Sequence, residues 1–275
     1  MPGPMSDLPQ TAFQGRVLII AGSDSGGGAG VQADIKTVTA LGGYAATAIT
    51  AITVQNTLGV SAVHPLPPEL IAAQARAVLD DIGADAIKTG MLGARGAVEA
   101  VAAILAEAGV PAVIDPVMVA KGGAALIDDD ALAAVRERLV PLAALLTPNA
   151  PEAAALTGLA AETTDDLRRA GEALLAMGAK AVLMKGGHVP GEQVTDLLIT
   201  RAGETSFSGA RIETRHTHGT GCTLASAIAA GLAQGLTLEA AVARAWAYVA
   251  EAIRRAPGFG AGAGPLDHAW PLRGR

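Results

Sequence analysis

Short apolar segments alternate with longer segments of helical pattern along most of the chain, and this alternation constrains the fold more than any other feature of the sequence. The apolar segments are hydrophobic throughout, as in residues 17–21, rather than at every second position. Such segments are typical of strands that helices cover on both faces. Strands separated by helices form βαβ units, in which the strands are parallel. The sequence therefore predicts an α/β fold, a three-layer αβα sandwich with a mostly parallel central sheet.

Each element is predicted from its own hydrophobic pattern and from its flanking glycines and prolines. Strands are expected over residues 16–21, 44–54, 86–89, 112–115, 143–146 and 181–185. Helices are expected over residues 29–41, 68–81, 94–108, 128–139, 150–157, 163–177, 219–234 and 238–255. A hairpin is expected from residues 194–200 and 204–207. No repeat or linker divides this pattern, so residues 16–275 are predicted to form one domain after a loose tail, residues 1–15.

The composition excludes several classes of protein. Hydrophobic residues make up 51% of the chain and charged residues 17%, which excludes a disordered protein. The net charge of −6 argues against a nucleic-acid partner, because affinity for a duplex comes largely from neutralised phosphates. A single cysteine, Cys222, excludes an internal disulfide and a cysteine-rich zinc site. With no signal-peptide pattern and no segment suited to a bilayer, we expect a cytoplasmic location and no membrane partner.

Polar and glycine-rich residues repeatedly follow the predicted strands. Ligands of an open parallel sheet bind at the carboxyl ends of its strands. The segments of this kind are 22–30, 115–118, 147–152, 185–188 and 217–222. One or two could arise by chance, but five favour a ligand site at one edge of the sheet.

The glycine-rich segment 26–30 has functional interpretations besides an ordinary turn. Residues 28–33 fit the G-x-G-x-x-A pattern of dinucleotide sites, but that pattern needs an acidic residue about 20 positions later. No acid occurs between Asp34 and Glu69, so we reject a nicotinamide dinucleotide. The absence of a Gly-Lys dipeptide excludes a P-loop. The remaining functional interpretation is a loop whose missing side chains let its backbone touch a small substrate.

The segment Gly219-Thr-Gly-Cys222 opens a predicted helix. Backbone N–H groups and the helix dipole make such a position suitable for an anion. A thiol there is expected to have a pKa below its ordinary value, which favours the thiolate. The alternative is a buried, inert cysteine, which is the more common state of a lone cysteine.

Three further residues have a functional and a structural interpretation each. Asn149 and Glu152 share one face of a first helical turn and could hold Mg²⁺ through water, but Asn149 is equally suited to be a helix cap. Lys185 precedes two glycines and could neutralise a phosphate, although a lone lysine is more often a solvated charge. Lys121, also before two glycines, is a candidate for a loop that closes over phosphates, and an ordinary exposed lysine fits equally well.

In combination and in this order, these segments resemble the hydroxymethylpyrimidine/phosphomethylpyrimidine kinases of thiamine biosynthesis, within the ribokinase-like superfamily. The resemblance extends from about Arg16 to His268 and does not depend on any single segment. The matching segments are Ala21-Gly-Ser-Asp-Ser-Gly-Gly-Gly-Ala-Gly-Val-Gln-Ala-Asp34, Val54-Gln-Asn56, Lys88-Thr-Gly-Met-Leu92, Asp115-Pro-Val-Met118, Leu146-Thr-Pro-Asn-Ala-Pro-Glu152, Leu183-Met-Lys-Gly-Gly-His188, Thr217-His-Gly-Thr-Gly-Cys-Thr223 and Gly262-Ala-Gly-Pro-Leu-Asp-His268.

The resemblance implies a ribokinase-like fold, a homodimer, and ATP and Mg²⁺ as cofactors. It implies that Gln55 hydrogen-bonds an aminopyrimidine, with Gly22, Ala29, Asp34 and Met91 around the ring. It places Asn149, Lys185, Gly219, Thr220 and Gly221 near ATP, and Asp115 and Glu152 near Mg²⁺. Cys222 occupies the position where most ribokinase-like sugar kinases carry an aspartate base. Whether Cys222 removes the hydroxyl proton or positions the hydroxyl group stays open.

The implied activity is that of a phosphotransferase with an alcohol acceptor. The γ-phosphoryl group of ATP would pass to the hydroxymethyl oxygen of 4-amino-5-hydroxymethyl-2-methylpyrimidine, and a second one to the resulting monophosphate, giving the diphosphate used for thiamine. Two alternatives stay open: a pyridoxal-type kinase on the same scaffold, since pyridoxal is also a small heteroaromatic alcohol, and a non-catalytic pyrimidine sensor.

Overall fold

The computed structural model describes residues 14–118 and 126–273. Residues 1–13 of the predicted tail and Lys121 of the predicted closing loop lie outside the described residues, so both expectations stay predictions. Within the described part, no helix has the length and apolar character needed to cross a bilayer.

An eight-stranded sheet forms the centre of the molecule, in the spatial order β10-β9-β8-β7-β6-β5-β1-β2, and a second sheet contains β3 and β4. The strands from β2 to β8 in the large sheet are parallel, and the hairpin β9–β10 adds two antiparallel strands at one edge. This confirms the predicted mostly parallel sheet and the hairpin. The strands are β1 (Arg16–Ala21), β2 (Tyr44–Ile49), β3 (Ala51–Asn56), β4 (Gly59–Pro65), β5 (Ala86–Thr89), β6 (Ala112–Ile114), β7 (Leu145–Leu146), β8 (Ala181–Met184), β9 (Gln193–Thr200) and β10 (Gly203–Ala210).

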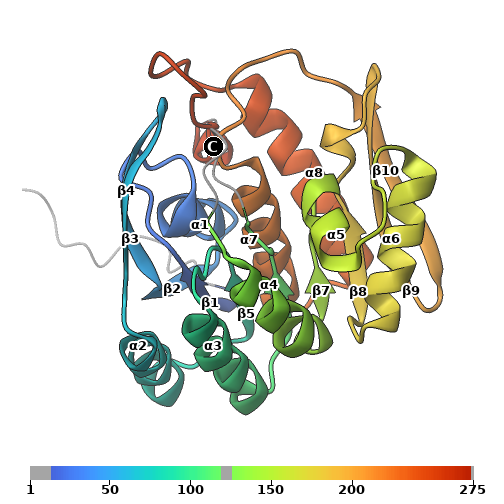
Figure 1. Cartoon of the computed structure of the whole chain (residues 1–275). Helices are drawn as coiled ribbons and strands as arrows, with labels where there is room; N and C mark the ends of the chain where they lie inside the picture. Colours follow the sequence, from blue (N-terminus) through green and yellow to red (C-terminus); the bar gives the residue numbers. More distant parts are fainter. Residues whose placement is uncertain (1–13, 119–125, 274–275) are drawn as a thin grey trace, which may run out of the picture.

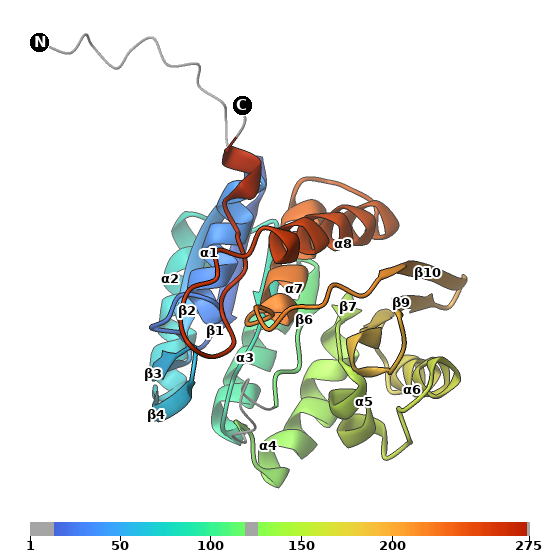
Figure 2. The ribbon, with the colours of Figure 1, turned by 90° about the horizontal axis from the view of Figure 1, so that it is seen from above.

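Helices cover both faces of the large sheet, which confirms the predicted three-layer sandwich (Figures 1 and 2). The helices are α1 (Gly30–Ala40), α2 (Pro68–Asp81), α3 (Arg95–Ala108), α4 (Asp129–Ala134), α5 (Ala150–Thr157), α6 (Thr164–Ala176), α7 (Thr220–Ala233) and α8 (Leu238–Arg254), with a π-helical segment η2 (Val135–Leu139) and the 3₁₀ segments η3 (Val140–Leu142), η4 (Gly186–His188) and η5 (Trp270–Leu272). Successive side chains of a strand point to opposite faces of a sheet. Val17 and Ile19 therefore belong to the core on the face that α1, α7 and α8 cover, whereas Leu18 and Ile20 belong to the core on the face that α2 to α6 cover.

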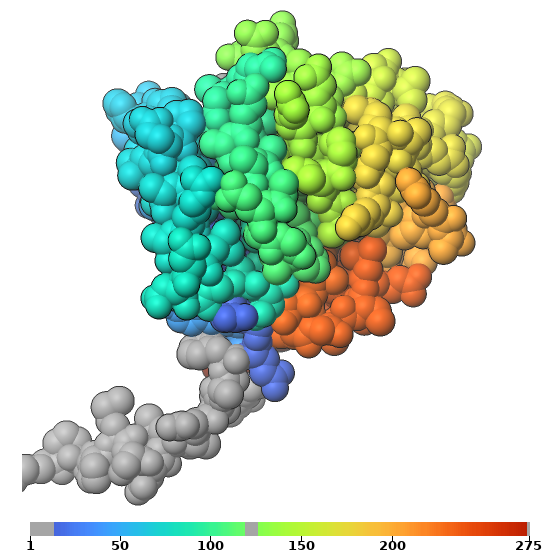
Figure 3. Space-filling view, turned by 90° about the horizontal axis from the view of Figure 1, so that it is seen from below, coloured from blue at the N-terminus to red at the C-terminus, as the bar shows by residue number. Residues whose placement is uncertain are grey.

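The layer formed by α2 to α6 follows the order of the chain. In the space-filling view from below, the surface passes from cyan α2 through green α3 to the yellow segment near β8 (Figure 3). α3 lies between the neighbouring strands β5 and β6, α4 between β6 and β7, and α5 and α6 between β7 and β8, so these helices lie in the order of the chain.

The prediction of one strand over residues 44–54 is wrong. β2 pairs with β1, whereas β3 leaves the large sheet and pairs with β4, a strand that the sequence did not predict. The break lies at Thr50, whose N–H donates to the carbonyl of Ala21 (3.0 Å) and whose hydroxyl donates to that of Met91 (2.6 Å). Strand propensity cannot locate this break, because it does not depend on which strand is the partner. The departure of β3 brings Gln55 to the cavity described below.

The order of the strands reverses at β1, which lies between β2 and β5. A reversal of this kind opens a crevice at the carboxyl ends of the strands. At the same edge of the sheet, the segments that follow β7 and β8 meet, since the N–H of Lys185 donates to the carbonyl of Pro148 (2.9 Å). The fold therefore brings together the polar segments that the sequence places after separate strands.

Candidate active site

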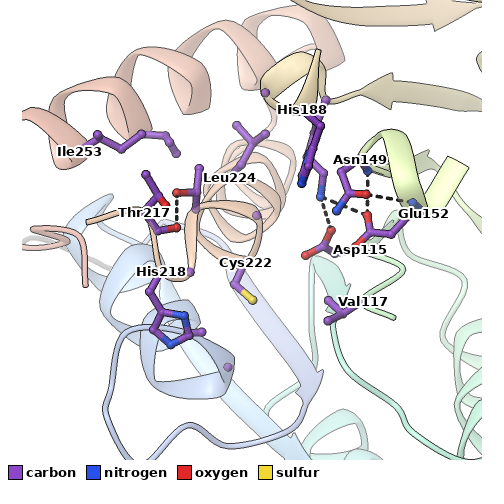
Figure 4. Close-up of a pocket in the computed structure, with 18 of the residues that line it drawn as sticks. Asp115, Val117, Asn149, Glu152, His188, Thr217, His218, Cys222, Leu224 and Ile253 are labelled. Atoms are coloured by element: carbon purple, nitrogen blue, oxygen red, sulfur yellow. Dashed lines mark hydrogen bonds and ion pairs between the residues drawn. The ribbon is translucent and has the colours of Figure 1, made fainter. Parts of the chain in front are cut away.

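A cavity of about 950 Å³ lies at this edge of the sheet. His218 and Cys222 lie on one side of it, and Asp115, Asn149 and Glu152 on the other (Figure 4). The cavity brings together twelve of the thirteen predicted site residues, whose roles stay predictions. They are Gly22, Ala29, Gln55, Met91, Asp115, Asn149, Glu152, Lys185, Gly219, Thr220, Gly221 and Cys222.

Two glycine segments pack backbone to backbone beside the first turn of α7. Gly219 has φ +82°, and a Cβ there would overlap the carbonyl oxygen of Gly28. A Cβ on Gly28 would lie 2.6 Å from Cδ2 of His218. The first N–H groups of a helix have no intrahelical acceptor and favour an anion. Glycine at these positions therefore lets the amino end of α7 form the wall of the cavity.

Lys185 lies between two carboxylates inside the cavity. Its Nζ is 2.8 Å from Asp115 Oδ1 and 3.6 Å from Glu152 Oε2, and its side chain is 13% exposed. Burial alone would lower the pKa of Lys185, but Asp115 and Glu152 outweigh burial and raise it. A Cβ on Gly221 would lie 3.3 Å from Lys185 Nζ, so glycine keeps the ammonium open toward α7. The interpretation of Lys185 as an ordinary solvated charge is wrong.

Asn149 and Glu152 form a capping box at the start of α5. The amide of Glu152 donates to Asn149 Oδ1 (2.9 Å), and the amide of Asn149 donates to Glu152 Oε2 (2.7 Å). The structural interpretation of Asn149 as a helix cap is therefore confirmed. Both side chains also line the cavity, so the cap holds the Glu152 carboxylate beside Lys185.

The pair Asp115 and Glu152 suits a magnesium ion better than a metal held by protein alone. Among the described residues, no group of three or more His, Cys, Asp or Glu side chains could hold a metal ion. Mg²⁺ is commonly held by one or two carboxylates, with water and substrate phosphates as its other ligands. Both carboxylates line the cavity on the same side (Figure 4). Burial raises the pKa of Glu152 against the attraction of Lys185, so an added cation there would favour its ionised form.

The prediction of a lowered pKa for Cys222 is wrong. Burial raises the pKa of its thiol to about 11, and the carboxylates of Asp34 and Asp115 act in the same direction. Lys88 and the N–H of Gly30 act in the opposite direction but do not compensate. The sequence-based expectation considered only the favourable effect of the helix amino end on the thiolate. The carboxylates that oppose it, Asp34 and Asp115, belong to segments distant in the sequence. The thiol is therefore protonated at neutral pH.

The prediction that Asp34 contacts the substrate is wrong. Asp34 is fully buried in α1 and does not line the cavity. Lys88 Nζ lies 2.8 Å from one of its carboxylate oxygens, and Ser226 Oγ donates to the other (2.7 Å). Asp34 therefore lies behind the cavity wall, where it neutralises the buried ammonium of Lys88.

Three residues around Gln55 received no site role from the sequence, although two of them lie in the polar segments 22–30 and 217–222: Asp24, Thr53 and His218. Asp24 accepts hydrogen bonds from the amides of the glycine-rich segment, and His218 Nε2 lies 2.8 Å from its Oδ2. The signal for Asp24 was an acid inside a glycine-rich turn, where a carboxylate commonly accepts from nearby amides. Thr53 and His218 carry no comparable local signal, because their partners are distant in the sequence.

Asp196, another residue that sequence analysis missed, lies at the part of the cavity next to Lys185. It accepts a hydrogen bond from the amide of Gly186 (2.8 Å), and burial raises its pKa to about 6. The signal was a single acid inside the apolar strand β9. Trp246 lines the same region and packs against Gly209, where a Cβ would lie 2.5 Å from its ring.

The comparisons with known proteins agree with one another. The family model described as phosphomethylpyrimidine kinase matches residues 24–267. The chain is 51% identical over 256 residues to the hydroxymethylpyrimidine/phosphomethylpyrimidine kinase of Streptomyces coelicolor, which covers 93% of this chain and 95% of that protein.

Solved structures give the same picture of the fold. An ADP complex of Bacillus subtilis pyridoxal kinase is similar with a TM-score of 0.88 and 37% identity, over 95% of this chain and all of that one. The phosphomethylpyrimidine kinase of Clostridium difficile 630 has a TM-score of 0.78 and 41% identity, over 86% of this chain and 99% of that one. The predicted ribokinase-like fold is confirmed.

Proposed function

This chain belongs to the phosphomethylpyrimidine kinase family, and from that premise we propose that it phosphorylates 4-amino-5-hydroxymethyl-2-methylpyrimidine and then its monophosphate, with ATP as donor. In each reaction a bond forms between the acceptor oxygen and the γ-phosphorus, the bond from that phosphorus to the bridging oxygen of ADP breaks, and ADP leaves. The first reaction also releases the hydroxyl proton, whereas the second has an ionised phosphate oxygen as acceptor and releases none. The observation that carries the proposal is a cavity that joins the amide of Gln55 to the amino end of α7 and to Lys185. One end of it suits a heteroaromatic alcohol, and the other suits a polyphosphate.

Phosphoryl transfer requires mainly positioning and neutralised charge. We assign the phosphates to the amides of Gly219, Thr220 and Gly221 and to the Lys185 ammonium, because helix amides and a buried cation act together there. Asn149 lines the same side of the cavity and is assigned to ATP as well.

Mg²⁺ is part of the proposal, with Asp115 and Glu152 as the residues that would hold it. When bound, the ion would neutralise phosphate charge. Thr147 Oγ1 donates to Asp115 Oδ1 (3.1 Å), which leaves Oδ2 available toward the cavity. The capping box fixes Glu152 in the same way.

We assign Cys222 to positioning the acceptor hydroxyl rather than to removing its proton. A thiol with a pKa of about 11 is protonated at neutral pH and so is a poor base. A loose transition state for phosphoryl transfer requires little basicity, because the hydroxyl group can keep its proton until late. The thiol can still exchange hydrogen bonds with the hydroxyl group.

A pyridoxal kinase is the second candidate, because the structure of the Bacillus subtilis pyridoxal kinase is similar over 95% of this chain. The two substrates differ at the ring edge beside the hydroxymethyl group. An assay of ADP release with the hydroxymethylpyrimidine, its monophosphate and pyridoxal tests the proposal. Turnover of both pyrimidines at a kcat/KM above that for pyridoxal is expected. Turnover of pyridoxal alone would establish the second candidate, and ADP release with none of them would overturn the kinase assignment.

A homodimer and a cytoplasmic location complete the proposal. The outward face of β3 carries two exposed apolar side chains, Ile52 (44%) and Val54 (53%), which is compatible with self-association. Sedimentation of the purified chain tests the dimer, and Val54→Lys is expected to shift it toward monomer.

A further inference from the structure

The hairpin formed by β3 and β4 is one wall of the cavity, although it lies outside the large sheet. Thr53, Gln55 and Val60 of the hairpin line the cavity. Near its base the hairpin is joined to the glycine-rich segment 22–30, since the amide of Gln55 donates to Ser25 Oγ (2.8 Å). The two strands form a sheet of their own, so the position of the hairpin tip depends on contacts with other segments.

A glycine-rich segment that follows α8, residues 258–265, contacts the tip of this hairpin and is named the strap. In Figure 1 it belongs to the red loop at the hairpin tip. The amide of Ala263 donates to the carbonyl of Thr57 (2.9 Å). A Cβ on Gly262 would overlap that same carbonyl oxygen, and a Cβ on Gly260 would overlap Thr57 Oγ1. The absence of side chains at these two glycines therefore allows the strap to lie directly against the tip.

The strap also contacts the segment that opens α7. The amide of His218 donates to the carbonyl of Gly264 (3.1 Å), and His218 forms a parallel bridge with Pro265. A Cβ on Gly264 would overlap Nδ1 of His216, so this contact too depends on glycine. His218 directly precedes Gly219, which opens the phosphate end of the cavity. The strap therefore joins the hairpin tip to the amino end of α7.

We propose that the strap positions the acceptor wall of the cavity against the amino end of α7, with Gly262 as the positioning residue at the hairpin tip. The inference rests on the proposed function and concerns how its two substrates are aligned. The strap itself does not line the cavity, so its effect on the reaction passes through the hairpin and through His218. It gives a role to residues 262–265, which belong to the resemblance but not to the site.

Gly262→Ala changes this contact with little other effect on the backbone. Gly262 is not among the glycines with a positive φ, so alanine can adopt its conformation. The atom that the new methyl group meets is the backbone oxygen of Thr57, which cannot rotate away as the end of a long side chain can. The strap and the hairpin tip must therefore separate, by ~1 Å, and a misplacement of that size can lower the rate of a reaction ~10²-fold.

The opposite side of the cavity is held by contacts of its own. The amide of Lys185 donates to the carbonyl of Pro148, and the capping box fixes Asn149 and Glu152 at the start of α5. A displaced hairpin tip leaves these contacts in place. We therefore expect the change to affect the pyrimidine and its alignment much more than the affinity for ATP.

The test measures initial rates of ADP release with 4-amino-5-hydroxymethyl-2-methylpyrimidine and ATP varied in turn. Gly262→Ala is expected to lower kcat/KM for the pyrimidine at least ~10-fold and to change KM for ATP less than ~3-fold. Ala261→Ser, at the exposed neighbouring position, is the matched control and should equal the wild type. Gly264→Ala, on the side of His216, should change the pyrimidine parameters in the same direction as Gly262→Ala. A purely structural role would reduce the amount of folded enzyme and leave both KM values unchanged.

Hydrogen exchange of the wild type provides a second measurement that needs no variant. The peptide that contains Ala263 is followed by mass spectrometry with and without saturating hydroxymethylpyrimidine. Because the strap lies outside the cavity, bound pyrimidine can protect this peptide only through the hairpin or through His218. We expect its exchange to become at least about twofold slower when the pyrimidine binds.

An unchanged kcat/KM for the pyrimidine in Gly262→Ala, or an equal rise in KM for both substrates, would overturn the positioning role and leave the kinase assignment intact. Should Gly262→Ala fail to fold, unchanged exchange of the Ala263 peptide in the wild type would overturn it, and slower exchange would support it. If the wild type releases no ADP with the pyrimidine, the proposed function itself has failed, and the positioning role fails with it.

Discussion

Lys88 Nζ lies 2.8 Å from Asp34 Oδ2, and neither side chain has any exposure to solvent. Ser226 in α7 donates to the other oxygen of Asp34 and lies one helical turn after Cys222, on the same face of the helix. The buried ion pair therefore supports the helix that carries the candidate reaction centre. It also acts electrostatically, since Lys88 lowers and Asp34 raises the pKa of Cys222.

Lys88→Met is expected to lower the free energy of unfolding by about 3–5 kcal/mol, because it leaves the carboxylate of Asp34 buried without its partner. Urea unfolding at pH 7 measures the loss. The double variant Lys88→Met/Asp34→Asn should recover much of it, since no charge is then left unpaired. A surface control, Arg76→Met, should have no measurable effect. Equal stability of the single and the double variant would contradict the pairing.

The alkylation rate of Cys222 by iodoacetamide is expected to rise about tenfold per pH unit between pH 7 and 10, because the thiolate is the reactive form. The thiol pKa of about 11 places this whole range below the midpoint. Mass spectrometry reads the rate directly, since the chain has one cysteine. A rate that levels off near pH 8 would show that the thiol ionises far more readily.

Cys222→Ala is expected to lower kcat less than ~10²-fold, because a positioning group contributes less than a general base. Cys222→Ser, which can still hydrogen-bond, should keep more activity than Cys222→Ala. Steady-state assays near pH 8 measure both. A loss of ~10²-fold or more in each variant would instead assign proton removal to Cys222.

Gln55→Ala is expected to raise KM for the pyrimidine, with little change in KM for ATP. The amide lies between His218 and Thr53, away from the Lys185 end of the cavity. Loss of two hydrogen bonds to a ring edge corresponds to at least ~10-fold in affinity. Initial rates with each substrate varied in turn separate the two constants. An equal rise in both would contradict the assignment of Gln55 to the acceptor.

Asp196→Asn is expected to flatten the dependence of stability on pH between about 4 and 6. An unfolded aspartate has a pKa near 3.9, whereas burial raises that of Asp196 to about 6. The folded chain therefore binds the extra proton, and Asp196 makes folding less favourable as pH rises through this range, by about 2–3 kcal/mol. Asparagine keeps an acceptor for the Gly186 amide and removes the charge.

Asp166 serves as the contrasting control for this experiment, because its hydrogen bond with Thr163 lowers the pKa of its carboxyl. Its contribution to stability is present above the unfolded pKa and is lost on acidification, so Asp166→Asn should change the slope in the opposite sense. Urea unfolding between pH 3.5 and 7.5 measures both variants. Identical slopes in the wild type and Asp196→Asn would show that Asp196 ionises normally.

The amino-acid sequence alone determined the layers of the fold and the edge of the sheet that carries the site. Unbroken apolar runs separated by helices leave few ways to bury those strands, and the polar segments after them must then share one edge. These features could be predicted because each depends on residues close together in the chain.

Only the tertiary structure decided which of these residues face the cavity and in what chemical state. Asp34 is buried behind the cavity wall, where its carboxylate neutralises Lys88, 54 positions later. The pKa of Cys222 is raised because burial and the carboxylates of distant residues have a larger effect than the groups that lower it. The break at Thr50, where β3 leaves the large sheet, was likewise set by the carbonyls of Ala21 and Met91, which are distant in sequence. Burial and charge interactions depend on distances in space, and only the folded chain fixes those distances.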